Sequence, residues 1–85
     1  MIQFKGGDGS TKEKAVIILN AESETQGVDA EYEYLDSKYG EYELVDQTFV
    51  GNDKKQYDIL TILLPDQGRK EIWFDVIDFY GMEDE

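Results

Sequence analysis

Residues 28–39 read VDAEYEYLDSKY and decide the fold, because they carry the strongest helix signal in the sequence. Large side chains recur there at spacings of four, three and four, and these are Val28, Tyr32, Leu35 and Tyr39. This spacing aligns them along one helix face, which is predicted to pack on the core. At about 100° per residue, Asp29, Glu33 and Asp36 fall on the opposite, solvent-facing side.

Both ends of this helix carry recognisable boundary residues. Ser23, with Gln26 three positions later, forms a capping-box pattern. Gly40 directly after Tyr39 supplies the left-handed residue that commonly ends a helix. The sequence therefore predicts one helix between Glu22 and Tyr39.

On either side of the helix the pattern indicates strands. Residues 42–50 and 56–64 alternate with period two around Gly51-Asn52-Asp53, which predicts an antiparallel hairpin. Residues 65–68 form a second turn, because proline presets φ and glycine takes the positive-φ position. Before the helix, residues 2–5 form a short strand, and the five consecutive apolar residues 15–19 indicate a strand inside the sheet.

Residues 75–81 are compatible with two interpretations. As a strand, they place aspartates on both faces. As a helical turn, Asp75 is the N-cap, Asp78 takes the third helical position and Gly81 ends the turn. Four apolar residues also share helical spacing, namely Trp73, Val76, Ile77 and Tyr80. We favour a strand to Phe74 followed by a short helical turn.

The elements combine into one α+β domain over residues 1–81, in the order β-β-α-β-β-β, with residues 82–85 as an acidic tail. We expect a mostly antiparallel sheet of four to five strands with one amphipathic helix on it. One helix covers less than half of one face of such a sheet. Either the sheet curls round its own core, or the other face keeps an exposed apolar patch. We expect the patch to serve self-association, as a homodimer, or partner binding, with the acidic helix outward.

A glycine-rich loop offers candidate ligand-binding residues. Gly7, Asp8, Gly9 and Ser10 could present backbone N–H groups to an anion. However, Lys12 follows the hydroxyl residues instead of preceding them, and the loop leads into a strand rather than a helix N-terminus. Asp8 would also repel a phosphate. A tight connection between strands is the favoured interpretation.

The chain resembles a group of small uncharacterised bacterial proteins. The resemblance rests on the Gly-Gly-Asp-Gly-Ser loop at residues 6–10, the strand at residues 14–18 and the Ala-Glu-Tyr-Glu-Tyr-Leu helix at residues 30–35. A Phe-Asp-hydrophobic ending that leads to an aromatic-Gly pair, here residues 74–81, is shared as well. The resemblance implies a compact bacterial cytosolic domain, and it implies no activity and no catalytic residue.

The residue types disfavour an enzyme. The sequence has no cysteine and no histidine, which removes thiolate metal sites and the usual general base at neutral pH. A calcium loop that starts at Asp8 fails at Lys12, and one sheet with one helix gives little depth for a pair of catalytic carboxyls. We expect no catalytic residue, no metal and no cofactor.

Charge gives the main indication of function. Twenty acidic against eight basic residues give a net charge of −12, which disfavours nucleic acid and anionic membranes as partners. No secretion signal or membrane-spanning run is recognised, so a cytoplasmic location is expected. Fourteen net negative charges come from residues 21–46 and 71–85, which carry −8 and −6.

The leading hypothesis is a non-catalytic interaction module that binds another, basic protein, as a bacterial inhibitor, immunity protein or adaptor. Its candidate contact residues are Asp29, Glu33, Tyr34 and Asp36. Tyr34 is included because it lies about 130° from the centre of the predicted core stripe. Two alternatives stay open: a small-ligand or cation-binding domain that uses residues 6–11, and a structural homo-oligomer.

Overall fold

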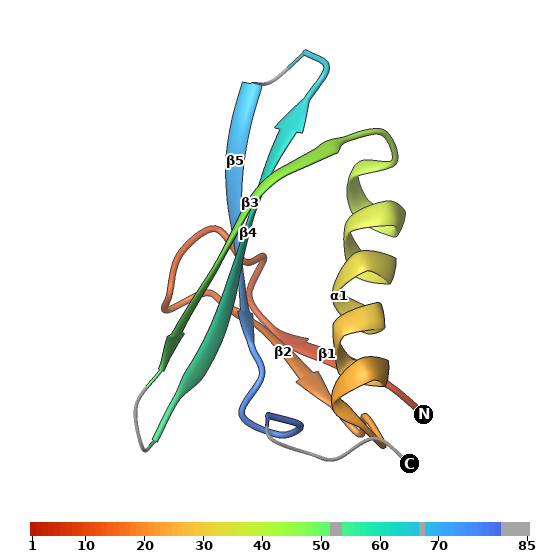
Figure 1. Cartoon of the computed structure of the whole chain (residues 1–85), viewed down its shortest axis with the longest axis vertical. Helices are drawn as coiled ribbons and strands as arrows, with labels where there is room; N and C mark the ends of the chain where they lie inside the picture. Colours follow the sequence, from red (N-terminus) through yellow and green to blue (C-terminus); the bar gives the residue numbers. More distant parts are fainter. Residues whose placement is uncertain (52–53, 67, 81–85) are drawn as a thin grey trace.

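One helix lies against one face of a twisted five-stranded sheet (Figure 1). The structure, a computed structural model, describes residues 1–51, 54–66 and 68–80. The elements in this part of the chain are β1 (Gln3–Gly6), β2 (Val16–Leu19), α1 (Glu24–Tyr39), β3 (Glu43–Gly51), β4 (Gln56–Leu64) and β5 (Gly68–Asp75). The predicted α+β class and element order are confirmed.

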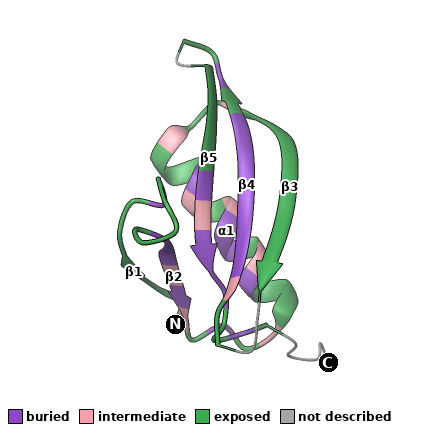
Figure 2. Ribbon diagram, turned by 90° about the vertical axis from the view of Figure 1, so that its left-hand side faces the viewer, coloured by how far each residue is buried: buried purple, intermediate pink, exposed green. Residues whose placement is uncertain are grey.

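The sheet has the strand order β1-β2-β5-β4-β3. Neighbouring strands are antiparallel except for β2 and β5, which pair in parallel through Val16 opposite Phe74 and Ile17 opposite Asp75. The last strand is thus inserted between the first two strands and the hairpin. This leaves β1 and β3 as the two edges of the sheet (Figure 2).

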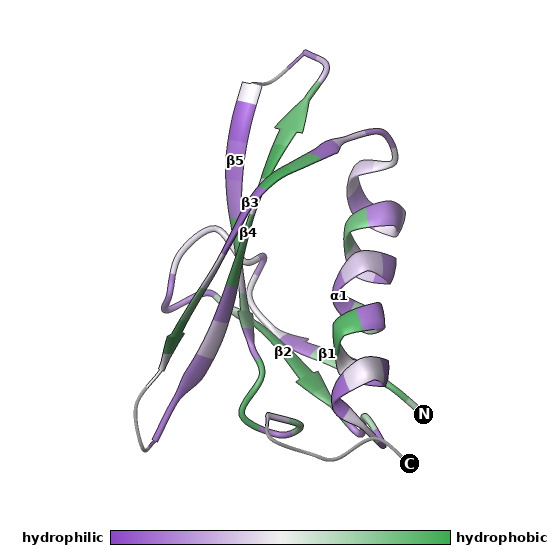
Figure 3. Ribbon diagram, viewed as in Figure 1, coloured by the Kyte–Doolittle hydropathy of each residue, from purple (hydrophilic) through white to green (hydrophobic). Residues whose placement is uncertain are grey.

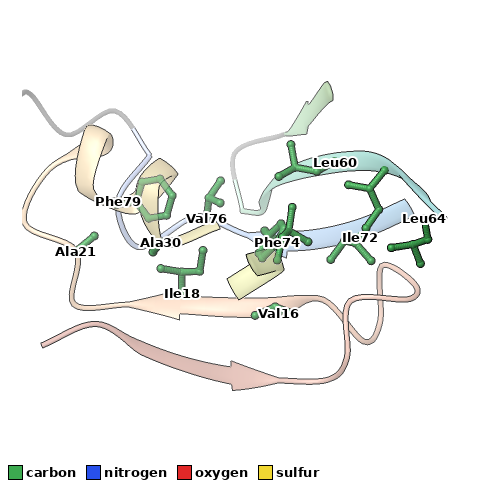
Figure 4. Packing of buried hydrophobic residues seen from close by; sticks show 12 residues of the cluster. Val16, Ile18, Ala21, Ala30, Leu60, Leu64, Ile72, Phe74, Val76 and Phe79 are labelled. Atoms are coloured by element: carbon green, nitrogen blue, oxygen red, sulfur yellow. The ribbon is translucent and has the colours of Figure 1, made fainter. Parts of the chain in front are cut away.

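The core lies between α1 and the sheet. It is formed by apolar side chains of β2, β4, β5, α1 and the segments that follow β2 and β5, namely Val16, Ile18, Ala21, Ala30, Leu35, Leu60, Ile62, Leu64, Ile72, Phe74, Val76 and Phe79 (Figure 4). Alternation along β4 directs Leu60, Ile62 and Leu64 toward the helix, as the sequence pattern predicts.

The sheet face away from the helix is mixed rather than apolar. Strand alternation and pairing place the exposed Lys5, Arg69 and Glu71 on it beside Leu63, which is 43% exposed. Tyr57 is nevertheless buried on this face, because the Trp73 ring lies 5.7 Å away and the Lys12 ammonium lies 5.8 Å from the Tyr57 ring centre. Among the described residues, this face therefore combines charged side chains with exposed apolar ones, Leu63 of β4 and Val50 of β3.

The helix boundaries follow from its capping residues. The Ser23 hydroxyl accepts a hydrogen bond from the Gln26 amide at 3.1 Å, and the Gln26 side chain accepts one from the Glu22 amide at 2.6 Å. At the other end, Gly40 has a φ of 72° and donates its N–H to the Asp36 carbonyl at 3.0 Å. Both predicted capping residues and the end at Tyr39 are confirmed, whereas the helix begins at Glu24, two residues after the predicted start at Glu22.

Removing the N-cap hydroxyl should weaken the helix measurably. Ser23→Ala leaves the Gln26 amide without its side-chain acceptor. We expect a loss of about 1 kcal/mol in the free energy of unfolding, the usual value for such caps. Urea denaturation followed by circular dichroism measures it, with Ser37→Ala at an exposed position of the same helix as the control. Equal midpoints for the two variants would contradict the assigned cap.

The face of α1 that packs on the sheet differs from the predicted stripe. The buried helix residues are Gly27, Ala30, Glu31 and Leu35, whereas Val28, Tyr32 and Tyr39 are only half-buried. The prediction was right for Leu35, and Val28, Tyr32 and Tyr39 do pack against the core. The centre of the buried face, however, lies at Gly27, Ala30 and Glu31. The physical reason is Phe79, whose ring occupies the space that a Cβ atom at Gly27 would need and lies beside Ala30 (Figure 4).

The end of the described chain forms the predicted strand and turn. β5 runs one residue further than expected, to Asp75, whose carboxylate accepts a hydrogen bond from the Ile77 amide at 3.2 Å. The Val76 carbonyl then accepts from the amides of Phe79 and Tyr80 at 3.1 and 2.9 Å. Of the four apolar residues that share helical spacing, Val76 is buried, whereas Ile77 and Tyr80 are exposed. Gly81 and the acidic tail lie outside the described residues.

Candidate interaction surface

The outward face of α1 is acidic and lacks compensating basic groups. Asp29, Glu33 and Asp36 are all exposed, on the side opposite the buried Glu31 and Leu35. Figure 3 shows hydrophilic residues on this outer side of the helix. Within residues 1–51, 54–66 and 68–80, none of these three carboxylates forms an ion pair. Their negative charge is therefore presented to solvent, as the sequence predicts.

Lys38 is the basic residue of the helix, and its side chain points away from the acidic face. Its ammonium lies 3.3 Å from both the Tyr34 hydroxyl and the Asp8 backbone carbonyl, so it ties α1 to the glycine-rich loop. Asp36 instead accepts a hydrogen bond from the Tyr42 hydroxyl at 2.8 Å. Partial burial, together with this bond, raises the pKa of Tyr42 to about 12. This bond holds the Asp36 side chain next to Tyr42, in the segment that connects α1 to β3.

Tyr34 does not belong to the acidic face. It is half-buried, and its ring centre lies 5.4 Å from that of Phe4 and 5.6 Å from that of Phe74, the latter in an edge-on arrangement. The ring therefore packs between the helix and the sheet. The expected position of Tyr34 beside Asp29, Glu33 and Asp36 is therefore wrong. The buried face of the helix is rotated about the helix axis relative to the predicted stripe, which turns Tyr34 toward the sheet.

The glycine-rich loop uses its amides inside the chain. The Gly7 and Gly9 amides donate to the carbonyls of Ala15 and Lys14 at 3.3 and 2.7 Å. The Ser10 amide donates to the Asp8 carboxylate at 3.0 Å, and the hydrogen bonds from Ser10 lower the pKa of Asp8. These are the N–H groups that an anion would require. The geometry supports the favoured interpretation of the loop as a strand connection.

The same loop is also anchored to the sheet. The Gly9 carbonyl accepts from the Trp73 amide at 2.7 Å, which places the loop along β5 next to the short parallel pairing with β2. Gly9 has a φ of 82°, and a side chain there would collide with Ile72. Glycine is required at this position for both reasons.

A buried carboxyl pair was missed by the sequence reasoning. Glu31 of α1 is 1% exposed, and neither of its carboxyl oxygens has a hydrogen-bond partner among the described residues. Burial, and secondly the neighbouring Asp58 of β4, raise the pKa of Glu31 to about 10. Glu31 is therefore protonated at neutral pH. Gly27, Glu31 and Leu35 are spaced four residues apart and therefore lie along the same helix face. This spacing was the signal that could have placed Glu31 inside.

Strand β3 is the second feature that the sequence did not reveal. All nine of its residues are exposed, although four of them are large and apolar (Figure 2). These four are Leu44, Val45, Phe49 and Val50, at 37 to 44% exposure. The hairpin pattern predicts the strand, but its position at the sheet edge depends on where β5 inserts.

A hollow of about 650 Å³ lies at the start of β3. Its lining includes three carboxylates and three apolar side chains, namely Glu41, Glu43, Asp66, Tyr42, Leu64 and Pro65. The described residues contain no group of three or more side chains arranged to hold a metal ion. The lining of the hollow therefore combines acidic and apolar side chains.

Comparisons with protein-family models, with curated proteins and with solved structures found no match. No helix in the described ranges is long and apolar enough to cross a membrane.

Proposed function

We propose that this protein is a non-catalytic interaction module whose acidic helix face binds a basic partner protein, in the manner of a bacterial inhibitor, immunity protein or adaptor. The observation that carries the proposal is the alignment of Asp29, Glu33 and Asp36 on the exposed side of α1 without an ion pair in the described part of the chain. A basic surface would neutralise these charges and gain from them.

Electrostatics supports this function in two further ways. A net charge of −12 on 85 residues produces a negative potential that accelerates encounter with a basic protein. The cluster is also held on a rigid element, since Ser23 and Gly40 cap the helix and Leu35 anchors it in the core. A rigid row of charges needs little reorganisation on binding.

Charge reversal on the helix tests the proposal. The double variant Asp29→Lys/Glu33→Lys should bind an oligolysine peptide about tenfold more weakly than the unaltered protein, because two surface ion pairs are lost and replaced by repulsion. Binding of the unaltered protein should weaken steeply above about 0.15 M salt. Isothermal titration calorimetry at two salt concentrations measures both effects.

The matched control changes net charge equally at other exposed sites. Glu13→Lys/Glu71→Lys changes the net charge by the same +4, at a position between the glycine-rich loop and β2 and at a position in β5. We expect only about a twofold loss of affinity from this control, through the change in overall potential. Equal losses for the two double variants would show that net charge alone attracts the peptide, and the helix would not be a binding face.

A further inference from the structure

The two edges of the sheet differ in how well they are protected against pairing with another chain. β1 is only four residues long, whereas β3 has nine. Proteins protect long edges with lysine, proline, bulges or covering segments. β3 contains no lysine and no proline, and its bulge at Val45 leaves Asp46–Gly51 in regular register with β4. This half of the edge has a row of backbone groups directed away from the sheet.

Apolar side chains lie on both faces of this edge. Phe49 is opposite Asp58 on the helix side, and Val50 is opposite Tyr57 on the other side. Both are about two-fifths exposed, although Phe49 already stacks on Tyr80 with a ring-centre distance of 4.9 Å. An added strand would cover Phe49 with one of its side chains and Val50 with the next.

Charge at the opposite end of the edge identifies what kind of strand fits. Glu43 and Asp46 belong to β3 itself, and Glu41 and Asp66 line the hollow where the strand starts. Lysine or arginine side chains from an added strand would meet four carboxylates there. A second copy of this protein would instead bring further acidic residues and another net charge of −12, which disfavours a β3–β3 homodimer.

We propose that β3 is the docking edge for an extended segment of the partner, which adds a strand to the sheet with apolar side chains over Phe49 and Val50 and basic side chains beside Glu43 and the hollow. This inference rests on the proposed function and specifies the form of the partner segment. Main-chain hydrogen bonds would supply affinity, and the apolar and acidic ends of the edge would set the direction of the segment.

The probe is a synthetic peptide with alternating Val and Thr in one half, so that Val covers Phe49 and the methyl group of Thr covers Val50, and with alternating Val and Lys in the other. Two further versions carry N-methyl groups on either the odd or the even amides, which blocks one edge of the peptide and keeps its side chains and charge. Because a strand uses alternate amides toward one neighbour, one methylated version should bind about tenfold or more weakly, and the other should bind like the parent. The protein itself is unaltered in this experiment.

Hydrogen exchange gives the location of binding. Amides of residues 46–51 should exchange more slowly with the parent peptide, whereas amides of β1, the other edge, should not change. Equal affinity of all three peptides would overturn strand addition and leave the helix-face proposal standing, provided that Asp29→Lys/Glu33→Lys still weakens them. Binding of oligolysine but not of the alternating peptide would likewise overturn strand addition and leave the helix-face proposal standing.

Failure of both oligolysine and the alternating peptide to bind would overturn the proposed function together with this inference. A concentration-dependent dimer in sedimentation, lost in Phe49→Lys but retained in the exposed-site control Glu13→Lys, would assign the edge to a second copy and overturn the partner strand.

Discussion

At pH 7, replacing Glu31 by methionine is expected to raise the free energy of unfolding by about 3 kcal/mol. The buried Glu31 keeps its proton in the folded protein up to a pKa of about 10, whereas in the unfolded chain it ionises near its ordinary value of 4.5. Between these values the unfolded state binds fewer protons, so stability falls as pH rises, by about 1.4 kcal/mol per pH unit. Methionine is similar in length and removes the ionisable group altogether.

The pH dependence identifies the cause of this effect. The contribution of Glu31 to the free energy of unfolding should be most favourable below about pH 5. It should decline through neutral pH toward pH 10. Glu31→Gln should flatten this decline, because it removes the ionisable group and keeps a polar side chain of similar size beside Asp58. Urea denaturation from pH 5 to 9 compares the variants. Glu33→Met, on the exposed face, serves as the control and should change stability by about 0.5 kcal/mol or less.

A decline with pH that is the same in Glu31→Gln as in the unaltered protein would contradict a protonated Glu31. Repulsion among the surface carboxylates produces a decline of the same sign. It is separated from the Glu31 effect by salt, which screens exposed charges but leaves a buried group largely unaffected.

Phe79→Ala should cost about 3 to 5 kcal/mol, the largest loss that we expect from a single substitution. Phe79 is 2% exposed, and its ring fills the space left by the missing side chain of Gly27. Its removal leaves a cavity between the helix and the turn after β5, and neither element can close it without moving the other. The melting temperature and the urea midpoint measure the loss.

The neighbouring Ile77 gives the matched control. It is 43% exposed and lies in the same turn, so Ile77→Ala should cost no more than about 1 kcal/mol. A greater loss for Ile77→Ala than for Phe79→Ala would therefore contradict the described packing of this turn.

The elements that sequence reasoning predicted correctly are those with local causes. Ser23 and Gly40 act within a few residues of the helix ends, and Gly68 has the positive φ, 73°, that the turn signal before β5 predicts. The rotation of the helix depends instead on the fit between Gly27 and Phe79, which are far apart in the sequence. Helical spacing identifies Val28 and Tyr32 from their hydrophobicity alone. It cannot show that a distant aromatic ring will pack against the helix where a glycine leaves space.

The candidate site was predictable to a similar degree. Asp29, Glu33 and Asp36 were assigned to the solvent side because the two sides of a helix are distinguished by spacing alone. Tyr34 was misplaced by the same rotation that buries Glu31. The exposed edge at β3 follows from the parallel pairing of β2 with β5, a contact between distant segments that no local pattern specifies.

The central claim is that two acidic surfaces of this molecule, the outer face of α1 and the edge strand β3, bind the partner. The most direct test is a residue-resolved NMR titration of the unaltered protein with the alternating Val, Thr and Lys peptide. We expect amide shift changes to concentrate at residues 29–36 and 43–51. Changes centred on the glycine-rich loop at residues 6–11, or spread evenly over all exposed carboxylates, would contradict the account.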